Sequence, residues 1–252
     1  MNFRALATKR NPHSVVDRLL AATRLAGSVS REDSKLVLEF VSFTHGQLLQ
    51  DLFAILASKG KHGGTFVEVG VGSGRRISNT FVLEKELGWT GILVEPNISS
   101  HASIRALRSS FLETRAAASK SGLKLQFEEV MDDGEFSRLS GANGHTVDAS
   151  RIKRYEVETI TLNDIFAASD MPDRIDFLSL DTEGSEVDIL AGLDLDRYTF
   201  GAMAIEHNHN PTALADLRRI LLPKGYKQVL EHLSGFDAWF VHSSSPNQFD
   251  GD

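Results

Sequence analysis

The amino-acid sequence predicts an α/β fold in which a mostly parallel β-sheet carries helices on both faces. From residue 65 onward, short apolar segments of strand length alternate with segments whose apolar residues recur at helical spacing. Glycine-rich and polar turns separate these segments. The chain then ends on two strand-like stretches, YKQVLEHL and FDAWFVH, joined by Ser234 and Gly235. This ending predicts an antiparallel hairpin in the otherwise parallel sheet.

The composition is that of an ordinary globular protein and is enough for one well-buried core. The chain has 252 residues, of which 41% are hydrophobic and 24% charged. We expect an N-terminal helical extension over residues 1–60 and one α/β domain over residues 61–252. The sequence has no cysteine, which excludes disulfides, thiolate metal sites and a cysteine nucleophile. No apolar run reaches the roughly 20 residues that a transmembrane helix needs.

Charge is unevenly distributed along the chain. The net charge is −7, but residues 1–31 hold six basic residues against one acid, Asp17, or +5, which leaves −12 for the rest. A nucleic-acid-binding protein usually shows a basic footprint, so nucleic acid is not an expected partner. The basic start allows three interpretations. We favour a solvated helix of a cytoplasmic, bacterial-type protein over an organellar targeting segment or a peripheral contact with an anionic membrane.

Each element follows from a local pattern. Residues 1–60 are expected to be helical, because apolar residues recur at helical spacing in LVLEFVSF and LLQDLFAILA. The expected strands are 65–69, 91–95, 112–117, 123–130, 155–160, 175–180 and 200–205. The expected helices are 77–87, 99–111, a helix from residue 185, and 211–222, which has proline in its first turn. The polar, glycine-rich segment 131–150 is expected to be a mobile loop over the site.

The first strand leads into the motif E-x-G-x-G-x-G, formed by Glu68, Gly70, Gly72 and Gly74. Glycine has no Cβ, so the backbone can turn sharply there and approach a ligand closely. The helix expected next would offer free N–H groups to an anion. Glu95 ends the following strand, where an acid in nucleotide-binding folds accepts hydrogen bonds from ribose hydroxyls. Together these residues predict a nucleoside site.

Polar residues also follow the later strands. Asp181 comes directly after strand 175–180, and Glu206, His207 and Asn208 follow strand 200–205. The carboxyl ends of parallel strands meet at one edge, so these side chains should face the same crevice as the glycine turn. Asp181, Glu206 and Asn208 offer the oxygen ligands that Mg²⁺ prefers, and His207 is the best general base by its ordinary pKa.

The spacing of these residues does not decide whether the site uses a metal ion or a general base. Side chains alternate in an extended segment, so Glu206 and Asn208 are expected to share a face while His207 points away. We favour Mg²⁺ at Asp181, Glu206 and Asn208, with Asp181 shared between ligand and base roles. Activation of a weakly acidic substrate group needs either a general base or a metal.

The sequence resembles the FkbM-type methyltransferases. The resemblance runs from about Gln47 to Val241 and is carried by GQLLQDLF, GGTFVEVGVGSG, SNT at 78–80, LEKELGWTGILVEPN, IDFLSLDTEGSE and IEHN. It implies the Rossmann-like methyltransferase fold with a seven-stranded sheet, S-adenosylmethionine as cofactor, and methyl transfer to a hydroxyl of a sugar, polysaccharide or secondary metabolite. It also implies that the E-x-G-x-G-x-G residues contact the methionine part and Glu95 the ribose. The remaining cofactor contacts would come from Ser78, Asn79 and Pro96.

Three other functions are weighed against this expectation. A nicotinamide-dependent oxidoreductase would use a similar sheet, but its fingerprint is G-x-G-x-x-G, whereas these glycines are spaced by two throughout. N-methyltransferases of nucleic acid or protein often carry Asn/Asp-Pro-Pro-aromatic after the fourth strand, where this chain has Asp-Thr-Glu-Gly. A binding module without catalysis is disfavoured by the intact acidic and amide residues. We therefore expect an O-methyltransferase acting on a small molecule or glycan, whose acceptor and oligomeric state the sequence does not identify.

Overall fold

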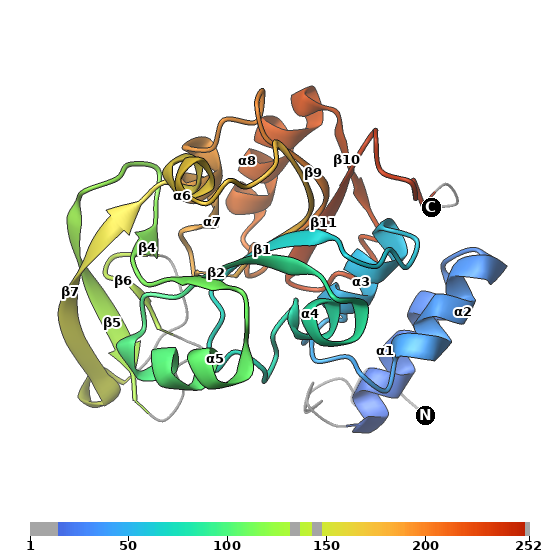
Figure 1. Cartoon of the computed structure of the whole chain (residues 1–252), viewed down its shortest axis with the longest axis horizontal. Coiled ribbons are helices and arrows are strands. Elements are labelled where there is room, and N and C mark those ends of the chain that lie inside the picture. Colours follow the sequence, from blue (N-terminus) through green and yellow to red (C-terminus); the bar gives the residue numbers. More distant parts are fainter. Residues whose placement is uncertain (1–14, 132–136, 143–147, 250–252) are drawn as a thin grey trace.

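The computed structural model describes residues 15–131, 137–142 and 148–249. A large sheet runs through the molecule (Figure 1). Its strands are β1 Thr65–Val69, β2 Thr90–Val94, β3 Phe111–Glu113, β8 Arg174–Leu180, β9 Thr199–Glu206, β10 Tyr226–Val229 and β11 Asp237–His242. The strand order is β10-β11-β9-β8-β1-β2-β3. Strand β11 is antiparallel to both its neighbours, and the other neighbouring strands are parallel. The predicted fold class, with its C-terminal antiparallel hairpin, is confirmed.

A smaller four-stranded sheet lies at the β3 end of the molecule. Its strands are β4 Ala116–Ala117, β5 Lys124–Val130, β6 Arg138–Leu139 and β7 Ile152–Ile160, in the order β4-β7-β5-β6. Strands β5 and β7, which cover the expected strands 123–130 and 155–160, pair antiparallel. The single strand expected over 112–117 is wrong, because the chain turns after β3. Glu113 Oε1 accepts the backbone N–H of Arg115 at 2.9 Å, and β4 then joins the smaller sheet.

The segment 131–150 was expected to be a mobile loop. Residues 132–136 and 143–147 lie outside the described residues. Between them, β6 pairs antiparallel with β5, so this part of the segment belongs to the smaller sheet. The side chain of Ser137, just before β6, lies 3.4 Å from Asn97 Nδ2, which donates to it. The smaller sheet therefore contacts the chain directly after Glu95.

Helices cover both faces of the large sheet. They are α1 Val15–Gly27, α2 Arg31–Phe40, α3 Gln50–Ala57, α4 Phe81–Leu87, α5 His101–Leu107, α6 Leu162–Ala168, α7 Glu186–Ala191 and α8 Pro211–Leu221, with 3₁₀ turns at Ile98–Ser100, Ala149–Arg151 and Leu222–Lys224. Successive side chains of β1 point to opposite faces of the sheet and so contact different helices. Phe66 packs in a core cluster with side chains of α3 and α4, whereas Val67 and Val69 pack with α6, α7 and α8.

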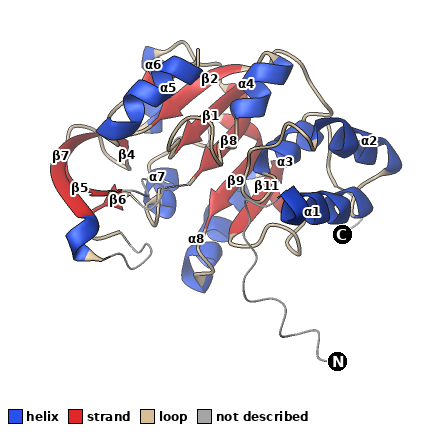
Figure 2. Ribbon diagram, turned by 90° about the horizontal axis from the view of Figure 1, so that it is seen from below, coloured by secondary structure: helices blue, strands red, loops and turns tan. Residues whose placement is uncertain are grey.

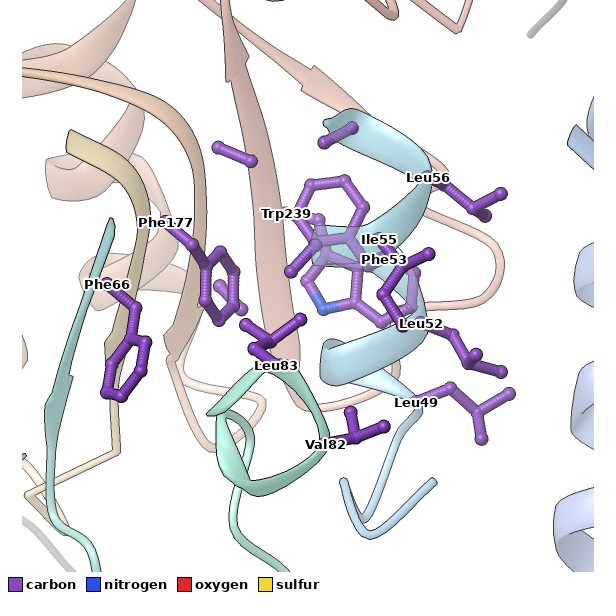
Figure 3. Packing of buried hydrophobic residues seen from close by; sticks show 14 of the residues in the cluster. Leu49, Leu52, Phe53, Ile55, Leu56, Phe66, Val82, Leu83, Phe177 and Trp239 are labelled. Atoms are coloured by element: carbon purple, nitrogen blue, oxygen red, sulfur yellow. The ribbon is translucent and has the colours of Figure 1, made fainter. Parts of the chain in front are cut away.

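Helix α3 is buried along its whole length and belongs to the core. The Phe53 ring stacks on Trp239 of β11, with centroids 4.7 Å apart, and meets Phe177 of β8 edge-on (Figure 3). Helices α1 and α2 lie beside α3 at the β11 end of the sheet, opposite the smaller sheet (Figure 2). Because α3 packs directly on the sheet, the boundary expected after residue 60 stays a prediction.

Three helices differ from the sequence predictions. The helix expected over 99–111 ends at Leu107, because the chain is extended from Arg108 and enters β3 at Phe111. The helix expected over 77–87 begins only at Phe81, because residues 78–80 turn inward to a buried carboxylate and Ile77 has a φ of 52°. Helix α6 was not predicted, although its signal is present. Thr161 accepts the N–H of Asp164, a cap of the T-x-x-D type. Among the described residues, no helix combines the length and apolar character needed to cross a bilayer.

Candidate functional site

The predicted site residues gather at one edge of the large sheet. The adjacent strands β9, β8, β1 and β2 end, respectively, at Glu206, Asp181, the glycine turn and Glu95. Backbone hydrogen bonds continue past the strand ends. Asp181 N donates to Val69 O at 2.9 Å, and Gly70 N donates to Val94 O at 3.0 Å. The shared edge therefore places both halves of the predicted site next to each other, as the sequence argument required.

The glycine turn depends on glycine for reasons internal to the protein. Gly70, Gly72 and Gly74 have φ values of 84°, 56° and 87°, a region that disfavours residues with a Cβ. A Cβ at Gly70 would lie 1.6 Å from Asp181 O, and one at Gly74 would lie 3.1 Å from Ile104 Cα. Close packing on β8 and α5 thus explains two of the three glycines. The predicted close approach of a ligand stays a prediction.

Glu95 braces the glycine turn. Its Oε2 accepts the N–H groups of Val71 at 3.0 Å and Gly72 at 2.8 Å, and its Oε1 accepts that of Asn97 at 2.9 Å. An ionised carboxylate has about four acceptor sites, so about one remains for a ligand hydroxyl. Burial raises the pKa of Glu95 to about 7, against the opposing effect of these three amides. Pro96, half-buried, lies between Glu95 and Asn97 in the same turn.

Glu68 lies buried beneath the turn and is held by protein groups. Its carboxylate accepts hydrogen bonds from Thr80 Oγ1 at 2.5 Å, Asn79 N at 2.7 Å and Ser78 Oγ at 3.0 Å, and Arg108 Nη1 lies 3.5 Å away. These bonds fold residues 78–80 under the turn. The proposed contacts of Glu68, Ser78 and Asn79 with a cofactor stay predictions, and the structure shows in addition that these residues position the turn.

Arg108 is a part of this arrangement that the sequence analysis missed. Its buried guanidinium donates to Glu84 Oε2 at 2.9 Å, to Thr80 Oγ1 at 2.8 Å and to the carbonyl of Gly74 at 3.2 Å. It therefore ties α4 and α5 to the glycine turn. Nothing in the sequence separates Arg108, which directly follows α5, from Arg105 within α5, which is exposed. Only the fold shows which arginine points inward.

Glu84 shows the strength of this network. Burial alone would raise its pKa, but hydrogen bonds from Ser110, Ser109 and Lys85, together with the charge of Arg108, lower the pKa to about 2. Glu84 is thus ionised at pH 7. Together with Glu68 it balances the buried positive charge of Arg108.

On the other side of the turn, Asp181 and Glu206 form a tightly coupled acidic pair. A hydrogen bond from Glu206 reaches Asp181. Burial, followed by the repulsion of the neighbouring carboxylates, raises the pKa of both groups. Asn208 turns elsewhere: its Nδ2 donates to Glu183 Oε2 at 3.4 Å, and its backbone has a φ of 50°.

These residues do not fit a magnesium ion as they are arranged. The two carboxyls share a hydrogen bond, and Asn208 directs its donor nitrogen, not its oxygen, at a third acid. Across residues 15–131, 137–142 and 148–249, no group of three or more histidines or acids is placed to hold a metal. The predicted metal ligands Asp181, Glu206 and Asn208 thus gain no support, and we derive no chemical step through a metal.

His207 has the features of a general base. The alternation expected beyond β9 is wrong, because Asn208 and His209 have positive φ values of 50° and 55°. His207 Nε2 lies 3.2 Å from Asp237 O, which can only accept, so we assign the hydrogen to Nε2 and the lone pair to Nδ1. Nδ1 is buried without a hydrogen-bond partner in the described residues. Burial also lowers the pKa of His207, which keeps the imidazole neutral at pH 7.

The raised pKa of Glu95 predicts a pH-dependent stability. A proton binds Glu95 more tightly in the folded protein than in the unfolded chain, so this contribution to the free energy of unfolding is present below pH 4.5 and lost as the pH rises through 7. We expect Glu95→Gln to remove a slope on the order of 1 kcal/mol per pH unit between these values. Urea denaturation of both ligand-free proteins at several pH values measures it. Parallel profiles would show that Glu95 is not buried as described.

Comparison with known proteins places these features in context. The chain matches the family model described as the methyltransferase FkbM domain over residues 68–228, more than half its length. No curated protein matches it. Solved structures with similarity include a methyltransferase FkbM from Methylobacillus flagellatus KT, with 12% identity and a TM-score of 0.45, covering 90% of this chain and 60% of that one. This chain thus spans less than two thirds of that protein.

Two further structures are similar at comparable levels. A precorrin-6y C5,15-methyltransferase from Geobacter metallireducens GS-15 has 12% identity and a TM-score of 0.39, with 71% of each chain covered. A SAM dependent methyltransferase from Aquifex aeolicus has 14% identity and a TM-score of 0.32, covering 71% of this chain and 81% of that one.

Proposed function

Because the chain belongs to the FkbM methyltransferase family, we propose that it is an S-adenosylmethionine-dependent O-methyltransferase acting on a hydroxyl of a sugar, polysaccharide or secondary metabolite. The family resemblance drawn from the motifs is thereby confirmed. One observation above all supports the proposal: Glu95 braces the glycine turn while keeping about one acceptor site, and that turn lies next to the polar end of β8, with the end of β9 beyond it.

The residues present fit the cofactor's chemistry. Glu95 would accept a ribose hydroxyl at its remaining site, and the turn of Gly70, Gly72 and Gly74 would pass beside the methionine part. The network of Glu68 and Arg108 keeps that turn in one conformation, so that little ordering is needed on binding. Bound S-adenosylmethionine supplies an electrophilic methyl group on a sulfonium. The protein's own task is then to align and deprotonate the acceptor hydroxyl.

We assign the proton transfer to His207, with Asp181 as the neighbouring acid. The Nδ1 lone pair of His207 takes the hydroxyl proton as the new bond forms. The Asp237 carbonyl holds Nε2–H, which fixes the tautomer. The imidazolium that results lies at the ends of β9 and β11, next to Glu206 and Asp237. A neutral hydroxyl is a poor nucleophile, so this deprotonation is the step that the site most needs to assist.

The test begins with cofactor binding. We expect the purified protein to bind S-adenosylhomocysteine in isothermal titration calorimetry and to show no binding of NAD⁺ at the same concentrations. Incubation with S-adenosylmethionine and a panel of sugars and hydroxylated metabolites should then release S-adenosylhomocysteine with an oxygen-methylated product. Binding of NAD⁺ in place of S-adenosylhomocysteine would favour the oxidoreductase alternative, and methylation of an amine nitrogen would favour the N-methyltransferase.

Metal removal separates the two mechanisms left open by the sequence. We expect exhaustive EDTA treatment to change the turnover number less than about twofold, because His207 rather than a metal-activated hydroxyl supplies the reactivity. The measurement is the methyl-transfer rate before and after dialysis against EDTA, with added MgCl₂ as the control. A loss of activity that MgCl₂ restores would return Asp181, Glu206 and Asn208 to the metal-ligand role.

A further inference from the structure

A cluster of five acids lies at the ends of β8, β9 and β11. This acid cluster consists of Asp181, Glu183, Glu186, Glu206 and Asp237. Each of the other four raises the pKa of Glu206 by charge repulsion, so the carboxyls lie close together. Glu206 and Asp237 are paired in register across β9 and β11, and cross-strand partners project to the same face of the sheet. The raised pKa values of Asp181, Glu206 and Asp237 show that negative charge is costly here unless a positive group compensates it.

The cluster also contains buried oxygens that nothing in the described residues satisfies. Among the described residues, Glu206 Oε2 and Asp237 Oδ1 of the cluster and Nδ1 of the adjacent His207 are buried side-chain atoms without a hydrogen-bond partner. Glu206 is only 5% exposed and Asp237 only 3%. A buried acceptor without a donor is rare in native proteins and calls for an explanation. The missing groups at this place are therefore hydrogen-bond donors.

Protein cations do not fill this role. The buried acids Glu68 and Glu84 pair with Arg108, but among the described residues none of Asp181, Glu186, Glu206 and Asp237 forms an ion pair with lysine or arginine. Asp237 Oδ2 accepts a hydrogen bond from Gln50 Nε2 of α3 at 2.9 Å, and the indole of Trp239 also lies close enough to lower the pKa of Asp237. A metal ion is not favoured either, for the reasons of geometry given above. An organic cation that donates hydrogen bonds remains.

The position of the unsatisfied carboxyls indicates that the organic cation belongs to the substrate that accepts the methyl group, and not to the cofactor. Neighbouring strands lie about 4.8 Å apart, so Glu206 on β9 is about 10 Å, and Asp237 on β11 about 14 Å, from the glycine turn on β1. Glu95, the proposed ribose ligand, lies one strand further away on the opposite side. The unsatisfied oxygens thus stand on the far side of Asp181 from the cofactor residues, beside the proposed base His207.

We propose that the acid cluster receives a protonated amine of the acceptor, so that the substrate class is an amino sugar or another hydroxyl compound that carries an amine. This inference rests on the proposed function. An ammonium group offers three hydrogen-bond donors and one positive charge, which matches oxygens of Glu206 and Asp237 that have no donor. Holding the amine there would place a hydroxyl of the same molecule within reach of His207 and the methyl group.

The experiment compares three sugars that differ only in the group at C2, which is an ammonium, an acetamide or a hydroxyl. Glucosamine, N-acetylglucosamine and glucose are titrated into the protein by calorimetry, with and without saturating S-adenosylhomocysteine. We expect glucosamine to bind at least about tenfold more tightly than the two neutral sugars. Glu206→Gln and Asp237→Asn, which keep the side-chain shape, should each remove this preference and leave affinity for S-adenosylhomocysteine within twofold. Glu231→Gln, which removes an exposed acid of the same charge, should leave it intact.

Four outcomes would overturn the inference. Equal affinity for the three sugars would show that the acid cluster does not bind an amine. The same conclusion would follow if both Glu206→Gln and Asp237→Asn kept the preference for glucosamine. Mg²⁺ binding to the wild type but not to Glu206→Gln would make it a metal site. A weakened affinity for S-adenosylmethionine alone would assign the cluster to the cofactor's sulfonium. Failure of S-adenosylhomocysteine to bind would instead reject the proposed function, and the titrations without it would still decide the amine question.

Discussion

Replacing Glu95 by alanine is expected to weaken binding of S-adenosylhomocysteine at least about 100-fold. The variant loses the acceptor proposed for the ribose, and it also leaves the N–H groups of Val71, Gly72 and Asn97 without their carboxylate. Hydrogen bonds to a charged group contribute roughly 1.5–3 kcal/mol each, and every 1.4 kcal/mol is a factor of ten in affinity. Isothermal titration calorimetry of wild type and variant measures the change.

Two further variants separate the roles of Glu95. Glu95→Gln keeps one acceptor oxygen, so we expect a loss of about tenfold, between those of the wild type and Glu95→Ala. Glu231→Ala removes an exposed carboxylate far along the chain and should bind the cofactor normally. Circular dichroism establishes that each protein is folded. A folded Glu95→Ala protein with wild-type affinity would place the ribose elsewhere and reject this part of the site.

Replacing His207 by alanine is expected to reduce turnover by about 100- to 10,000-fold, the usual contribution of a general base. Affinity for S-adenosylhomocysteine should stay within twofold, because His207 lies at the end of β9, two strands from the glycine turn. In the wild type, turnover should rise as His207 loses its proton and level off above its pKa, which burial places below 6.5. Rates of methyl transfer from pH 5 to 9 with the identified acceptor provide the measurement.

Variants of Asp181 and His207 together test whether His207 is the general base. His207→Gln keeps a hydrogen-bonding side chain but has no basic nitrogen, and we expect it to be as inactive as His207→Ala. Asp181→Asn, which keeps the size of the side chain, should retain more activity than either. If Asp181→Asn were inactive while His207→Gln kept near-normal turnover, Asp181 would be the base and the tautomer argument for His207 would not apply.

The fold class and most of the order of elements follow from the sequence alone, although α6 and the break between β3 and β4 were not predicted. Apolar runs at strand and helix spacing, together with the hairpin around Ser234 and Gly235, are local patterns, and local patterns need no knowledge of distant contacts. Parallel strands have their carboxyl ends at the same edge of the sheet, so the strand assignments alone predict that Glu95, Asp181 and Glu206 lie at one edge. The family could also be recognised from the sequence, because each of its motifs is a contiguous stretch of residues.

The tertiary structure alone decided what each of these side chains does. Arg108 balances Glu68 and Glu84 across intervals of 40 and 24 residues, and no local pattern marks whether Arg105 or Arg108 will face inward. The imidazole of His207 is set by a carbonyl on β11, and the unpaired oxygens of Glu206 and Asp237 arise only once two distant strands pair. Hydrogen bonds and charges depend on distance in space, and chain spacing carries that information only within a strand, a turn or a helix.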